Sequence, residues 1–207
     1  MVRLINRVLI LIIVSALFFS SCVTFSTLHT PETIEPGHIS FNAGVSTLAN
    51  NIFNGGSVTI YPEAGWRVGV VEGFDMGFKY THPFIFSWDS KFQLYDGPVK
   101  IAFDIGTVIF PVSIFTTIDV NPMLIIGQKH WYAGVKSTFT AVDIFNIDES
   151  IHGIYYYGTT VITGISLGQE KLKLLVELNT MFRKEDNYRP FISNPSFMPA
   201  LGLTYGF

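Results

Sequence analysis

Hydrophobic and polar residues alternate with a period of two along most of this chain, and the last stretch shows the pattern most clearly. There, the large apolar residues Leu201, Leu203, Tyr205 and Phe207 are separated by small or polar ones. Such alternation gives a β-strand one apolar face and one small or polar face. Because no stretch after residue 38 has a convincing helical period, the pattern predicts an all-β body.

The alternation predicts ten antiparallel strands, at roughly residues 38–48, 57–71, 74–80, 84–95, 99–110, 114–126, 131–140, 155–167, 172–179 and 197–207. The connections differ in length, with tight turns at Glu72, Asp96, Gln128 and Gln169 and longer polar loops near Asn50, Asp143 and Arg183. Short turns on one side and long loops on the other are typical of outer-membrane barrels. The connections near Thr81 and Pro111 are shorter than this pattern requires, which leaves eight strands as an alternative.

The small residues of the polar face indicate that this face lies inside. Small side chains suit a narrow interior in which opposite strands meet, and they stand at Gly44, Gly69, Gly77, Ala102, Gly106, Gly134, Gly164, Gly202 and Gly206. The other face is bulky and apolar, with aromatic residues near the strand ends, where membrane interfaces would lie. Closure of the sheet would satisfy every backbone group in lipid. The sequence therefore predicts a closed antiparallel up-and-down transmembrane β-barrel.

The charge content supports the same interpretation. Charged residues make up 14% of the chain, aromatic residues 15%, and the mean hydropathy is +0.38, whereas roughly 25% of residues are charged in soluble proteins. The inward face carries a balanced set of charges, which can pair across the lumen as buried charges require: Glu63, Arg67, Asp75, Lys79, Asp89, Lys91, Lys100, Asp104, Asp119, Lys136, Lys173 and Glu177. We predict a lumen charge network built on Arg67, Lys79, Asp89, Lys91, Asp104, Lys136 and Glu177. A net charge of −3 favours no nucleic-acid partner.

The N-terminus has the organisation of a targeting segment. Arg3 and Arg7 precede an apolar run over residues 8–19, which is too short to span a bilayer and has the size of a signal-peptide core. The sequence Phe19-Ser20-Ser21-Cys22 resembles a lipobox, which implies lipidation at Cys22. The alternative is ordinary signal cleavage with an incidental cysteine. We therefore predict a helical signal peptide over residues 1–21, a lipidated cysteine and linker over 22–37, and a barrel over 38–207.

Several hairpin stretches and the C-terminal tail resemble small bacterial outer-membrane β-barrel proteins. The hairpin stretches are Trp66-Arg67-Val68-Gly69, the run from Glu72 to Phe78, and Asp89-Ser90-Lys91-Phe92-Gln93. The tail with Leu201, Leu203, Tyr205 and Phe207 resembles the assembly signal of that class. The resemblance implies a cell outer-membrane location, contact with outer-membrane lipid, and partners in the barrel-assembly and lipoprotein-sorting machinery. An even number of strands would place both barrel ends on the periplasmic side, together with a lipid-anchored Cys22.

The sequence contains no recognisable catalytic or metal-binding motif, so we expect a non-catalytic protein without cofactor or metal. His38 and Ser40 could resemble a lipase pair, but no motif accompanies them. The favoured function is an outer-membrane barrel lipoprotein with a structural, adhesive or small-permeability role. Two alternatives stay open: a lipid-modifying barrel enzyme, and a periplasmic lipocalin-like lipoprotein that binds an apolar ligand.

Overall fold

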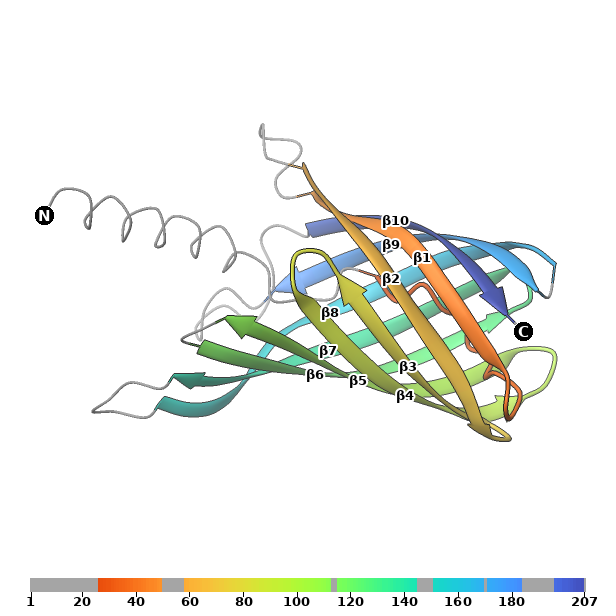
Figure 1. The fold of residues 1–207 in the computed structure, drawn as a ribbon, viewed down its shortest axis with the longest axis horizontal. Coiled ribbons are helices and arrows are strands. Elements are labelled where there is room, and N and C mark those ends of the chain that lie inside the picture. The colour runs from red at the N-terminus through yellow and green to blue at the C-terminus, as the bar shows by residue number, and fades with distance from the viewer. Residues whose placement is uncertain are drawn as a thin grey trace, which may run out of the picture.

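The computed structural model describes residues 26–49, 58–112, 115–144, 151–169, 171–183 and 196–206. Within them, ten antiparallel strands close into a barrel (Figure 1). The strands are β1 (Ile39–Ala49), β2 (Val58–Val71), β3 (Phe74–Thr81), β4 (Ile85–Asp96), β5 (Lys100–Val112), β6 (Phe115–Gln128), β7 (Trp131–Ile144), β8 (Ile151–Gly168), β9 (Leu172–Arg183) and β10 (Ser196–Gly206). The predicted ten-stranded barrel is confirmed, and the alternative of eight strands is wrong.

Each strand pairs with its neighbours in sequence, and the first strand closes the barrel against the last. In that closing pair, β1 and β10 are antiparallel, with Gly44 opposite Gly202 and Ser40 opposite Gly206. Among the described strands, this arrangement leaves no edge unpaired. Closure matters because an unpaired backbone edge has no hydrogen-bonding partner in hydrocarbon.

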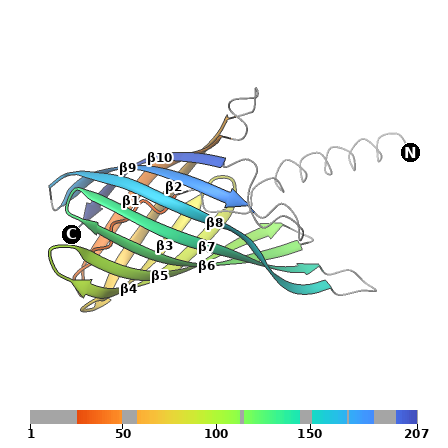
Figure 2. The same ribbon diagram turned by 180° about the vertical axis from the view of Figure 1, so that it is seen from behind.

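The two ends of the barrel differ in their connections. At one end, which we call the turn end, the connections after β2, β4, β6 and β8 are two or three residues long. The start of β1 and the end of β10 lie at this same end (Figure 2). The opposite end, which we call the loop end, carries the connections over residues 50–57, 145–150 and 184–195. It also carries two short connections, His82–Phe84 and residues 113–114.

The burial of side chains is the inverse of that in a soluble protein. On the outer face Leu203 is 52% exposed and Leu124 is 50% exposed, whereas the inward Lys91 and Asp75 are 1% and 0% exposed. Exposed apolar groups around buried charges require an apolar surrounding, so the barrel is a transmembrane one. In the described part of the chain, no helix is long and apolar enough to cross a bilayer.

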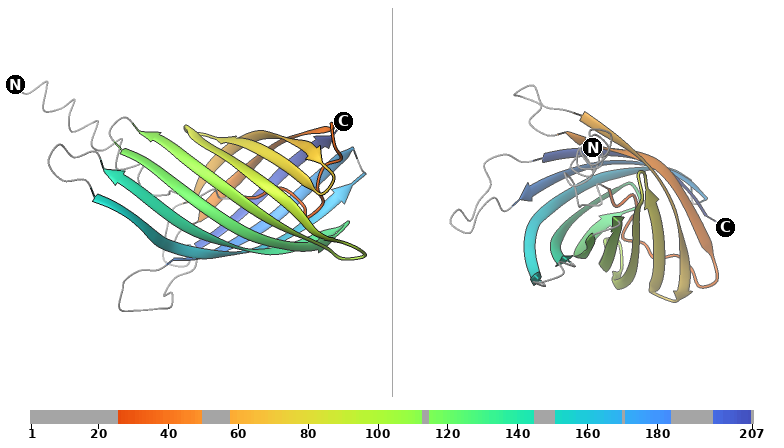
Figure 3. Two further views of the ribbon diagram at one scale, coloured as in Figure 1. Left: turned by 90° about the horizontal axis from the view of Figure 1, so that it is seen from below. Right: turned by 60° about the vertical axis from the view of Figure 1, so that its left-hand side comes forward.

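The described residues that precede β1 lie inside the barrel. Residues 26–38, which we call the threaded segment, run through the ring of strands (Figure 3). The sequence predicted a linker over residues 22–37, and the described part of that stretch occupies the lumen, where it contacts β2, β3, β4 and β9. Cys22, the signal peptide and Phe207 lie outside the described residues, so lipidation and signal cleavage stay predictions.

Apolar side chains fill part of the interior. One cluster, made of Leu48, Ile85, Val108, Met181 and Met198, lies toward the loop end, where β4 begins and β1 ends. A second cluster surrounds Leu28 of the threaded segment and contains Met123, Ile125, Tyr132, Ile162, Leu175 and Ala200. The charged part of the lumen lies beside these clusters, against the threaded segment.

Candidate functional site: the occupied lumen

The threaded segment contains no helix or strand, and its sequence favours neither. Pro31 and Pro36 lack backbone donors and restrict their neighbours to extended conformations. The backbone groups of the segment therefore need partners from the wall. Lys91 supplies two of them, since its Nζ donates to the carbonyl oxygens of Thr30 at 3.0 Å and Glu32 at 2.5 Å. Charged wall residues thus bind the backbone of the segment.

Glu177 of β9 is the main acceptor for Thr27 and Leu28 of the threaded segment. Its carboxylate accepts hydrogen bonds from the Thr27 backbone N–H at 2.8 Å, the Thr27 hydroxyl at 2.5 Å and the Leu28 N–H at 3.0 Å. Tyr132 and Asn179 of the wall donate to the same carboxylate at 3.0 Å and 2.6 Å. Five donors satisfy one buried charge, which removes the usual penalty for burying it unpaired.

Ser26 is held by an ion pair of β2 and β3. The Ser26 hydroxyl donates to Glu63 at 2.5 Å, and Lys79 Nζ donates to the Ser26 carbonyl oxygen at 2.6 Å. Lys79 and Glu63 are themselves paired at 3.0 Å. The pair therefore binds both the hydroxyl and the carbonyl oxygen of Ser26, and it fixes the end of the described segment.

Two glycines of the closing strand pair make room for Leu28. A Cβ atom on Gly44 or on Gly202 would stand 2.8 Å from Leu28 Cδ1, closer than real contacts allow. These glycines face each other across β1 and β10. The small inward residues that the sequence predicted therefore include two that leave space for the chain's own N-terminal segment.

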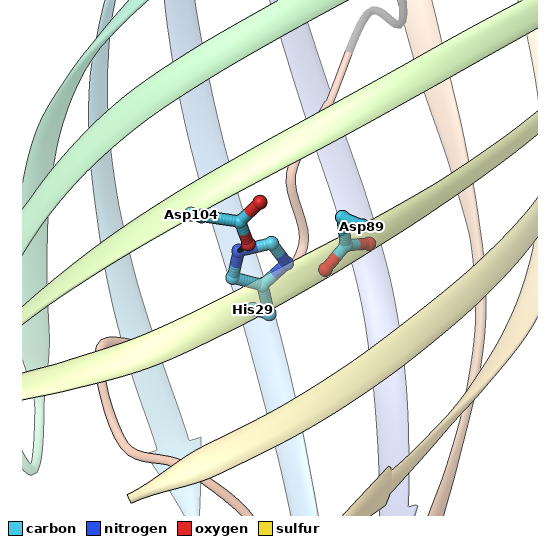
Figure 4. Close-up of side chains that lie close together, drawn as sticks. All are labelled: His29, Asp89 and Asp104. Atoms are coloured by element: carbon cyan, nitrogen blue, oxygen red, sulfur yellow. Dashed lines mark ion pairs between the residues drawn. The ribbon is translucent and has the colours of Figure 1, made fainter.

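Arg67 of β2 stands at the centre of the charge cluster. Its Nε lies 3.0 Å from Asp75, one of its Nη atoms contacts Asp89, and the same atom lies 3.7 Å from Asp104. His29 of the threaded segment completes the cluster, with Nδ1 3.2 Å from Arg67 and Nε2 3.1 Å from Asp104 (Figure 4). The segment thus enters the network through a side chain as well as through its backbone.

The surroundings of His29 favour its neutral form. Burial, together with the nearby Arg67 charge, lowers the pKa of His29 to about 4 against the opposing effect of Asp104. A neutral ring protonated on Nε2 fits both neighbours, because Arg67 has only donors and the Asp104 carboxylate only accepts. His29, Asp89 and Asp104 could hold a metal by distance. The Arg67 guanidinium already supplies a positive charge between these two carboxylates, so we assign no metal site.

The turn end of the lumen is an open vestibule of about 890 Å³. Glu32 of the threaded segment lies here, 2.9 Å from Lys173 and 3.6 Å from Lys100. Burial would raise the pKa of Glu32, but the hydrogen bond from Lys173 and the charges of both lysines outweigh it and lower the pKa. Where the segment leaves the vestibule, the Gly37 N–H donates to the carbonyl oxygen of Gly69 at 2.9 Å.

The predicted site residues lie on two faces of the barrel. The predicted network residues line the lumen: Arg67, Lys79, Lys91, Asp104, Lys136 and Glu177 are buried, and Asp89 is partly exposed. Leu201, Leu203 and Tyr205 of the predicted assembly signal are exposed on the outer face. Sequence analysis missed Ser26, Thr27, His29 and Glu32 as members of the lumen site. A stretch without periodicity carries no signal for binding through its backbone.

His38 and Ser40 both border the vestibule. His38 Nδ1 lies 3.8 Å from Glu35 Oε2, with both side chains largely exposed to solvent. In the described residues no hydrogen bond joins His38 to Ser40. The geometry therefore adds no support for a lipase-like pair, and the absence of an enzyme activity stays a prediction.

The fold and the lumen together define a transmembrane β-barrel whose interior holds the threaded segment of its own chain. No protein-family model and no curated protein sequence matches the chain. Among solved structures, the N-terminal β-barrel domain of Pseudomonas aeruginosa OprF is 11% identical, with a TM-score of 0.37 over 84% of this chain and 100% of that one. The outer membrane protease OmpT from Escherichia coli is 10% identical, with a TM-score of 0.43 over 86% and 100%. Neisserial surface protein A is 13% identical, with a TM-score of 0.32 over 82% and 96%. At these values the similarity is one of barrel fold alone.

Proposed function

We propose that this chain is a non-catalytic outer-membrane barrel lipoprotein with a structural or adhesive role. The observation that carries the proposal is the occupied lumen, in which wall charges bind the threaded segment at Glu177, Lys79 and Lys91. A diffusion pore needs a continuous water-filled passage, whereas here the segment and the loop-end apolar cluster stand in the way. A small-permeability role is therefore the less favoured part of the sequence prediction.

Three features support the outer-membrane part of the proposal. Short turns gather at one end and longer connections at the other, which is the arrangement of bacterial outer-membrane barrels. The outer face of β10 presents Leu201, Leu203 and Tyr205, in keeping with an assembly signal read from the final strand. The lipobox-like sequence before Cys22 adds a lipid anchor, with outer-membrane lipid and the assembly and sorting machinery as partners.

The lipocalin-like alternative is not favoured by the exterior of the barrel. A lipocalin keeps its apolar residues inside around the ligand and presents polar ones to water. Here Leu124, Val135 and Leu203 are about half exposed, while the interior is charged. Such an exterior needs lipid rather than water around it.

Membrane fractionation of a Cys22→Ala variant tests the proposal. A barrel embedded by its own strands stays in the membrane fraction after an alkaline wash, even without the lipid anchor. It also migrates faster on a denaturing gel when left unheated, because the closed sheet resists the detergent. Release of the variant into the soluble fraction would contradict the membrane barrel, and loss of labelled-palmitate incorporation in Cys22→Ala tests the anchor separately.

A further inference from the structure

We propose that the N-terminal end of the mature chain leaves the barrel at the loop end, so that a lipidated Cys22 lies on the cell surface. The inference rests on the proposed function for the outer membrane and the lipid. It differs from the sequence prediction, which placed Cys22 on the periplasmic side with the barrel ends. The direction of the threaded segment carries it.

The contacts of residues 33–37 with the barrel wall lie close to the turn end. Gly37 bonds to Gly69, near the end of β2, and the Ile34 N–H donates to Asp75, near the start of β3, at 2.9 Å. Thr33 donates to Gln93 of β4 at 3.1 Å. The chain therefore enters β1 from the turn end, as the position of Ile39 requires.

The contacts of residues 26–29 with the barrel wall lie further from the turn end. His29 reaches Arg67, and Thr27 reaches Glu177 near the middle of β9. Ser26 reaches Glu63, whose partner across the sheet is Thr81, the last residue of β3. The contacts of residues 32–37 therefore lie near the turn end, those of Thr27 and His29 lie further along the wall, and that of Ser26 lies furthest. The segment thus climbs the lumen once, from the turn end toward the loop end.

At Ser26 the wall on one side has almost ended. The β3–β4 connection, His82–Phe84, follows directly after Thr81, and the His82 N–H donates to the carbonyl oxygen of Pro62 at 2.9 Å. Glu63 is the next residue along β2. The Ser26–Glu63 hydrogen bond therefore brings the segment to the upper part of the short β3–β4 wall.

Chain length decides between the two ends of the barrel. Cys22 lies four residues before Ser26, and four extended residues span at most about 14 Å. The eight residues of β3 rise roughly 18–20 Å along the barrel axis at a tilt of about 40°. The chain before Ser26 cannot retrace that height to the turn end, whereas the loop end is within reach. A lipid on Cys22 would then insert into the outer leaflet.

Epitope insertion in intact and permeabilised cells tests this topology. We would insert the same epitope, with a flexible linker, after Val23, into the β4–β5 turn at Gly97, and after Ile147 in the β7–β8 connection. Heat-dependent migration shows that each variant is folded, and labelled palmitate shows that each is lipidated. The Gly97 insertion marks the turn end, and the Ile147 insertion marks the loop end.

The expected result is that antibody binds the Val23 and Ile147 epitopes on intact cells, with no gain on permeabilisation. The Gly97 epitope should gain its signal only after permeabilisation. A Val23 epitope that behaves like the Gly97 epitope, or that stays unreactive in both conditions, would overturn the threading. If instead Gly97 and Ile147 respond alike, the membrane barrel of the proposed function fails, which is a separate outcome.

Discussion

Glu177 binds Thr27 through two hydrogen bonds, one from the backbone N–H at 2.8 Å and one from the hydroxyl at 2.5 Å, although the residues are 150 positions apart. This contact joins the start of the described chain to the ninth strand. It makes the threaded segment part of the folded barrel interior. The stability of the barrel and the position of the segment should therefore respond to the same substitutions.

The substitution Glu177→Gln should destabilise the barrel by about 2–3 kcal/mol. It removes the charge that strengthens the hydrogen bonds from Thr27, Leu28 and Tyr132. The free energy of unfolding in urea, with the protein in lipid vesicles, measures the effect. Glu72→Gln in the exposed β2–β3 turn is the matched control and should change stability by less than about 0.5 kcal/mol. Equal effects of the two substitutions would show that the Glu177 charge does not hold the segment.

The substitution Gly202→Val should displace Leu28 from its position between β1 and β10. A Cβ at Gly202 already lies 2.8 Å from Leu28 Cδ1, and overpacking of this kind costs about 1–3 kcal/mol. Proteolysis of the segment in detergent-solubilised protein should become faster. Gly206→Val is the control on the same strand face, because its nearest neighbours would be 4.0 Å away. Equal protection in the two variants would contradict the placement of Leu28.

Stability should fall as the pH is lowered from about 6.5 toward 4. The pKa of His29 is lowered from 6.5 to about 4 by burial and by Arg67, so the unfolded chain binds the proton first. The contribution is complete above the unfolded pKa and is lost progressively below it, by up to about 3 kcal/mol. Unfolding temperatures across this range measure it. His29→Gln should flatten the profile between these values, and an unchanged slope would show that His29 is not buried in the neutral form.

An arginine on the outer face should be harmful at the membrane centre and tolerated at the turn end. Val176 and Leu172 both face outward on β9, at 38% and 52% exposure, and Leu172 begins the strand. We expect Val176→Arg to cost about 2–4 kcal/mol and Leu172→Arg about 0–1 kcal/mol, because the cost depends on depth. The fraction of folded protein in vesicles, measured by heat-dependent migration, compares them. Similar losses in both would argue against lipid on this face.

Much of the barrel could be predicted from the sequence because each strand repeats one signal. The alternation in stretches such as Phe74 to Tyr80 predicts both a strand and its two faces. The burial of side chains along β3 alternates in the same way. Small residues at Gly44 and Gly202 also indicated a crowded interior correctly. What crowds it there is the chain itself, since Leu28 packs against both glycines.

The position of residues 26–37 could not be predicted from their side chains. Lys91 binds carbonyl oxygens of this stretch, and Asp75 and Glu177 accept from its backbone N–H groups. Every residue has a backbone carbonyl and every residue except proline has a backbone N–H, so the sequence of the segment contains no pattern that marks it for the lumen. The balanced inward charges were predicted to pair with each other, and part of their hydrogen-bonding capacity serves the segment instead.

Conductance of the folded full-length protein in a planar lipid bilayer tests the central claim most directly. The claim is that the segment from Ser26 to Gly37, with the wall charges and the apolar cluster, closes the lumen of a membrane barrel. Protein whose heat-dependent migration shows it to be folded should insert without producing discrete conductance steps. Stable, reproducible steps from the same preparation would contradict a closed lumen and would identify the barrel as a pore.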